Sequence, residues 1–62
     1  MIQKVKEILR DKNKSFYWLS KQTGIPTSTL GNYVNGAEVP WKNACKIADA
    51  LNVKLDDLRE DN

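Results

Sequence analysis

Few of the 62 side chains in this sequence could carry covalent or metal chemistry. The chain has no histidine and a single cysteine, Cys45. A serine or cysteine nucleophile usually needs a neighbouring base and an orienting group, and no such arrangement is visible in the sequence. A lone thiol without histidine cannot form an internal disulfide or a zinc site of the usual kind. We therefore expect no enzymatic activity, no metal, no cofactor, and a reducing cytoplasmic environment.

Charged side chains are the second group with a possible chemical role, because lysine and arginine can bind phosphate. The net charge of +2 is too small to indicate a nucleic-acid partner by itself, but the charges are unevenly distributed. Residues 1–14 carry five basic and two acidic side chains, whereas residues 55–62 carry one basic and four acidic ones. The basic N-terminal segment is either a solvated face or a source of attraction for phosphates, and the acidic end should avoid them.

Signals for helix starts and stops divide the first part of the chain into two short helices. A helix over residues 2–11 is predicted by apolar residues at helical spacing, which are Ile2, Val5, Ile8 and Leu9. The Ser15 hydroxyl can accept a hydrogen bond from the free amides that open the next helix, over residues 16–23. Gly24 supplies the left-handed conformation that ends this helix and turns the chain sharply.

Prolines mark the starts of the later helices. Pro26 suits a first helical turn and predicts a third helix over about residues 26–35. Pro40 precedes a fourth helix, over about residues 41–51, whose apolar stripe consists of Trp41, Ala44, Cys45, Ala48 and Leu51, with Ile47 beside it. Acidic residues in the segment 54–58 suit the positive end of a helix dipole and predict a short fifth helix. Because no strand pattern of useful length is present, the predicted fold class is all-α.

The aromatic residues divide into two groups. Phe16 and Trp41 are expected in the core, together with Cys45 as a small apolar residue. Phe16, Tyr17 and Trp18 are consecutive and cannot share one helix face, so Tyr17 and Trp18 either pack at the periphery or contact phosphate or a partner. No apolar run approaches the roughly 20 residues of a membrane span, and the length fits one domain over residues 1–62.

Two blocks of the sequence carry a recognisable pattern. The first block, residues 19–36, contains in order Leu19, Ser20, Gly24, Ile25, Leu30 and Asn35-Gly36. This order resembles the helix-turn-helix of lambda-repressor-like, Cro-type (XRE) proteins, where a small residue such as Ser20 lets two steeply crossing helices approach. The second block, residues 47–58, resembles the fourth helix of that family and the turn into its fifth. The resemblance implies a compact five-helix domain with the helix-turn-helix in its second and third helices.

The family resemblance also implies a function. We expect a sequence-specific regulator of transcription that binds double-stranded DNA, most readily a repressor, in a bacterium or its phage. The helix over residues 26–35 would lie in the major groove, where the positions that match the family's base-reading residues are Thr27, Ser28, Gly31 and Asn32. Asn32 is the strongest candidate among them, because an asparagine amide can bond an adenine edge at two points.

Contacts with the DNA backbone are expected on both sides of this reading helix. The residues chosen for them are Lys14, Ser15, Tyr17, Thr29, Lys42 and Asn43. The chain departs from the family pattern at Phe16, where a phosphate-binding glutamine is common, so Tyr17 or the amides that open the same helix would replace that contact.

The resemblance also implies a homodimer on a near-palindromic operator, with half-sites about 10 base pairs apart. Leu55 and Leu58, with the tail of residues 59–62, are the expected dimer seam. A protein-binding adaptor or antitoxin module is the alternative function, and it would use the same helical surface, including Tyr17 and Trp18.

Overall fold

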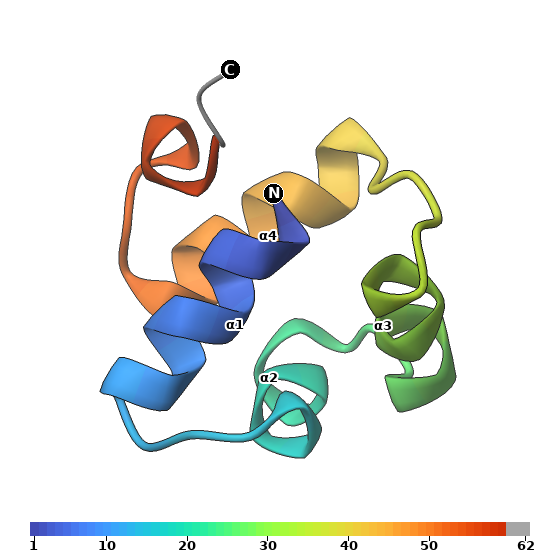
Figure 1. Cartoon of the computed structure of the whole chain (residues 1–62), viewed down its shortest axis with the longest axis horizontal. Helices are drawn as coiled ribbons and strands as arrows, with labels where there is room; N and C mark the ends of the chain where they lie inside the picture. Colours follow the sequence, from blue (N-terminus) through green and yellow to red (C-terminus); the bar gives the residue numbers. More distant parts are fainter. Residues whose placement is uncertain (60–62) are drawn as a thin grey trace.

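The computed structural model describes residues 1–59, which form four α-helices and one 3-10 turn (Figure 1). The elements in chain order are α1 (Ile2–Asp11), α2 (Phe16–Thr23), α3 (Thr27–Val34), α4 (Trp41–Leu51) and the 3-10 turn η1 (Leu55–Leu58). No strand occurs within these described residues, which confirms the all-α fold class. Since η1 is a single 3-10 turn, the count of five helices is corrected to four α-helices and this turn.

Local hydrogen bonds explain why the helices begin and end where the sequence predicts. The Ser15 hydroxyl accepts a hydrogen bond of 3.1 Å from the backbone N–H of Trp18 and so caps α2. Gly24 ends α2 with φ of 79°, in the left-handed region that a side chain disfavours. Pro26 stands just before α3 and Asn35 just after it, so this helix is slightly shorter than predicted.

The turn between α2 and α3 is held by two side-chain hydroxyls of α2. The Ser20 hydroxyl donates a 2.6 Å hydrogen bond to the carbonyl oxygen of Ile25, across the turn. The Thr23 hydroxyl donates to the carbonyl of Leu19 and accepts from the backbone N–H of Ile25. Small size is therefore only part of the role of Ser20, because its oxygen also ties the end of the turn to α2.

One apolar core joins all five elements. Its buried side chains are Val5, Leu9, Leu19, Ile25, Leu30, Tyr33, Ile47, Ala48, Leu51 and Leu58. Helix α2 packs against both α3 and α4, while α1 packs against α3 and η1, so the ends of the described chain meet. Phe16 packs against this core as predicted, and Cys45 is half-buried. Within residues 1–59, no helix is long and apolar enough to cross a bilayer.

Trp41 does not belong to this core, which corrects the sequence expectation. Its side chain is 73% exposed, although Ala44, Ala48 and Leu51 on the same stripe are buried. Helical side chains tilt toward the N-terminus of their helix, and Trp41 is the first residue of α4. Its indole therefore extends past the end of the helix, beyond the core.

Candidate nucleic-acid interface

Helix α3 has one buried side and one polar, exposed side. Leu30 and Tyr33 are buried in the core, so they fix which side of the helix faces outward. The expected base-reading positions 27, 28, 31 and 32 lie at spacings of one and four residues and therefore share one side of a helix. Thr27, Ser28 and Asn32 are exposed, as a reading face requires.

Gly31 lies between these exposed residues and is half-buried. A Cβ atom built on Gly31 would meet no heavy atom within 4 Å, so the fold itself does not require glycine at this position. A bare backbone here gives α3 a shallow surface on which another molecule can approach closely. Pro26, which precedes α3, provides no side-chain cap for the first amides of the helix.

The expected backbone-contact residue Asn43 is already engaged within the chain. Its Nδ2 donates a 2.8 Å hydrogen bond to the hydroxyl oxygen of Tyr33, which joins the start of α4 to α3. One amide hydrogen of Asn43 is used in this bond, so a second hydrogen and the Tyr33 hydroxyl hydrogen can still donate. Lys42 precedes Asn43 and is exposed, whereas Thr29 on α3 is half-buried.

Two lysines lie over aromatic rings on α2. The Lys14 Nζ is 5.3 Å from the centre of the Trp18 ring, and the Lys21 Nζ is 5.3 Å from the centre of the Tyr17 ring. Tyr17 is 63% exposed, while Trp18 is half-buried and packs against the core. An exposed cation–π contact contributes only about 0.5–1 kcal/mol, so either lysine can leave its ring to bind a phosphate.

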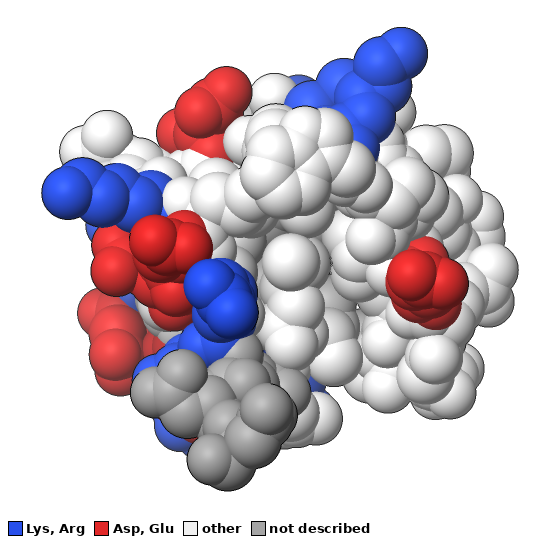
Figure 2. All heavy atoms as spheres, turned by 90° about the horizontal axis from the view of Figure 1, so that it is seen from above, with Lys and Arg blue, Asp and Glu red and all other residues white. Residues whose placement is uncertain are grey.

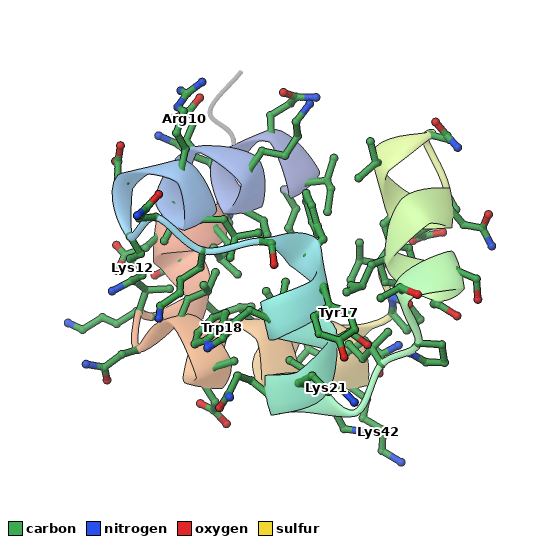
Figure 3. All side chains as sticks on the ribbon, turned by 90° about the horizontal axis from the view of Figure 1, so that it is seen from below. Arg10, Lys12, Tyr17, Trp18, Lys21 and Lys42 are labelled. Carbon is green, nitrogen blue, oxygen red and sulfur yellow. The ribbon has the colours of Figure 1, made fainter. Side chains whose placement is uncertain are left out.

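Figure 3 shows basic and aromatic side chains on two sides of α2. Tyr17, Lys21 and Lys42 lie on the side of α2 nearer to α3, whereas Trp18 and Lys12 lie on the other side. Because Lys14 lies over Trp18, the structure places its ammonium group away from α3 and apart from Tyr17. Sequence reasoning missed Lys21, although its spacing of four residues from Tyr17 on one helix was a usable signal.

The expected dimer seam is only partly at the surface. Leu55 is half-buried, but Leu58 is 0% exposed because η1 folds back onto α1 and α4 and inserts this side chain into the core. Leu58 therefore offers no surface to a second chain, which corrects that expectation. Arg59 is exposed, and residues 60–62 of the expected seam lie outside the described residues.

The acidic turn lies far from the polar side of α3. In Figure 1, η1 is at the opposite end of the molecule from α3, with α1 between them. Asp56 and Asp57 are on this turn, where the Asp57 carboxylate accepts a hydrogen bond from the backbone N–H of Lys54. An anionic ligand on α3 would therefore meet little repulsion from η1.

The family of Cro/C1-type helix-turn-helix DNA-binding domains matches residues 4–62, which is nearly the whole chain. No curated protein and no solved structure matches the chain.

Proposed function

We propose that this chain represses transcription in a bacterium or phage by placing α3 in the major groove. The chain belongs to the family of Cro/C1-type helix-turn-helix DNA-binding domains and is therefore a DNA-binding regulator. The observation that carries this proposal is the polar, exposed side of α3. Thr27, Ser28 and Asn32 can reach base edges there, because the apolar side of the helix is held in the core. Such an arrangement reads sequence without any rearrangement of the fold.

In the proposed complex, the side chains have different tasks. Asn32 bonds an adenine edge, and the hydroxyls of Thr27 and Ser28 accept or donate with either base pair. Gly31 allows the backbone of α3 to approach the edges of the bases. Specificity therefore depends most on Asn32, since it is the one residue of this set that can make two directed bonds to one base.

Backbone contacts orient α3 in the groove. Lys42 supplies a positive charge at the start of α4, and Tyr17 supplies a hydroxyl at the start of α2, on the same side as Lys42. Thr29 adds a weaker donor, as do Ser15 and Asn43 with the hydrogens that their internal bonds leave free. Lys14 binds phosphate after its ammonium leaves the Trp18 ring.

We further propose that two copies bind a near-palindromic operator. A single copy presents one reading helix and contacts one half-site, so useful affinity comes from two half-sites about 10 base pairs apart. The acidic turn η1 then lies away from the phosphates of its own half-site.

The direct test is selection of bound duplexes from a random pool, followed by titration of the selected duplex at several salt concentrations. If each complex makes about six to ten phosphate contacts, affinity should fall by about 10³ to 10⁵ between 50 and 200 mM salt. An enriched motif with two-fold symmetry and this slope would support the proposal. Failure to enrich any motif, with no salt-dependent binding, would refute it and favour the adaptor or antitoxin alternative.

A further inference from the structure

The Asn35-Gly36 pair at the end of α3 is part of the sequence pattern but has no task in the proposed reading face. Both residues are exposed, and Asn35 is the C-cap of α3. None of the side-chain hydrogen bonds within residues 1–59 uses the Asn35 amide. Asparagine is chemically labile, and it is most labile before a glycine, because no side chain then shields the backbone nitrogen that follows it.

We propose that Asn35 is a site of spontaneous deamidation and that its conversion weakens the binding of DNA. The backbone nitrogen of Gly36 attacks the side-chain carbonyl carbon of Asn35, and the new bond between them closes a succinimide ring. The bond from that carbon to Nδ2 breaks, and Nδ2 leaves as ammonia with the proton that the Gly36 nitrogen gives up. Water then opens the ring at either carbonyl, which leaves aspartate or isoaspartate at position 35.

Two backbone hydrogen bonds hold the turn in which this reaction occurs. The N–H of Gly36 donates to the carbonyl of Tyr33 at 3.1 Å, and the N–H of Ala37 donates to the carbonyl of Asn32 at 2.9 Å. Ring closure requires ψ of Asn35 to rotate far from its value of 7°, which breaks the first bond. Asn35 and the three residues after it are exposed, so this turn opens without removing a side chain from the core. The folded chain therefore reacts, but more slowly than the unfolded chain.

The product changes the charge of the proposed reading helix. Residues 22–37 contain no charged side chain, and Figure 2 shows a largely uncharged surface on the side of the molecule where the loop after α3 lies. A carboxylate at position 35 lies about one helical turn from Asn32 and repels the phosphates beside the groove. It also lies at the negative end of the helix dipole, which disfavours it. This consequence rests on the proposed function, whereas the reaction itself does not.

Mass spectrometry of the aged chain tests the site. After incubation in mildly alkaline buffer, the mass change from amide to acid should accumulate, and fragmentation should assign it to position 35. Asn13, Asn43 and Asn52 precede residues with side chains and should stay intact over the same period. Conversion in the folded chain should be slower by about tenfold or more than in urea, since only open molecules react. Earlier conversion of another asparagine, or none in a period that converts the unfolded chain completely, would overturn the inference.

Titration of the selected duplex tests the consequence. Asn35→Asp should raise the dissociation constant by about threefold or more, and ageing should cause a similar loss in the unchanged chain. Asn35→Gln is the matched control, because glutamine keeps the amide but closes a larger ring much more slowly, so this variant should keep its starting affinity during ageing. Full conversion at position 35 without a loss of affinity would overturn the inferred weakening. A fresh chain that binds no duplex would refute the proposed function alone, because the mass measurement still decides whether Asn35 reacts.

Discussion

Replacing Asn32 with alanine should remove sequence discrimination without damaging the fold. Asn32 is exposed on α3 and makes no hydrogen bond to another side chain among the interactions seen in residues 1–59. Alanine favours the helical conformation more than asparagine does, by up to about 0.7 kcal/mol. The stability of the domain should therefore stay equal or rise slightly, and any loss of binding comes from the missing amide.

The expected loss of binding is about 1–3 kcal/mol for each half-site, the usual contribution of a two-point contact between a side chain and a base. The dissociation constant for a single half-site should therefore rise by about 5-fold to 150-fold. On an operator with two half-sites, the loss of binding free energy is doubled, because each of the two bound copies loses the same contact.

Fluorescence anisotropy with the selected duplex and with duplexes changed at single base pairs measures this effect at constant salt. Asn32→Ala should bind all variants of one base pair almost equally, while the unchanged chain still discriminates among them. Gln22→Ala is the matched control, because it also removes an exposed amide but lies beside Lys46 and Asp49 of α4, away from the reading face. Equal losses of affinity on cognate and random duplexes would show that Asn32 contacts the backbone and that the reading face is misplaced.

Four further variants test other parts of the structure. Lys42→Ala should weaken binding to all duplexes by a similar factor and lower the slope of log affinity against log salt by about 1, whereas a change in base preference would contradict its role as a backbone contact. Gly24→Ala should lower the free energy of unfolding by about 1–2 kcal/mol in urea denaturation, because φ is 79° there, while Gly31→Ala should raise it by about 0.5–1 kcal/mol and still weaken DNA binding. Leu58→Ala should cost about 2–5 kcal/mol of stability, measured by thermal or urea unfolding, and a cost close to zero would mean that η1 detaches from the core in solution.

The helix bounds could be predicted from the sequence because their signals are local. The Ser15 cap, the left-handed Gly24 and the two prolines act within one or two turns of the residues that they order. The buried side of α3 could be predicted for the same reason, since Leu30 and Tyr33 lie at helical spacing.

The environments of Trp41 and Leu58 could not be predicted in this way. The burial of Leu58 depends on the docking of η1 against α1, which is distant in sequence. Spacing alone placed Trp41 on the apolar stripe, but the core ends before the first residue of α4. The family resemblance predicted Leu58 at the dimer seam, but η1 packs so that the Leu58 side chain is buried in the core. The partner of Asn43 was also missed, because a hydrogen bond between two helices has no signature in either helix alone.

The hydrogen bond from Asn43 to the Tyr33 hydroxyl gives the proposed interface a fixed dimension. It joins α3, the proposed reading helix, to the helix whose first turn holds Lys42, so in the proposed complex the protein sets the spacing between a base edge and a phosphate. A duplex whose groove is wider or narrower must deform to match this spacing, and the cost of deformation depends on its sequence. The chain would then distinguish operators at base pairs that no side chain touches, through the stiffness of the DNA.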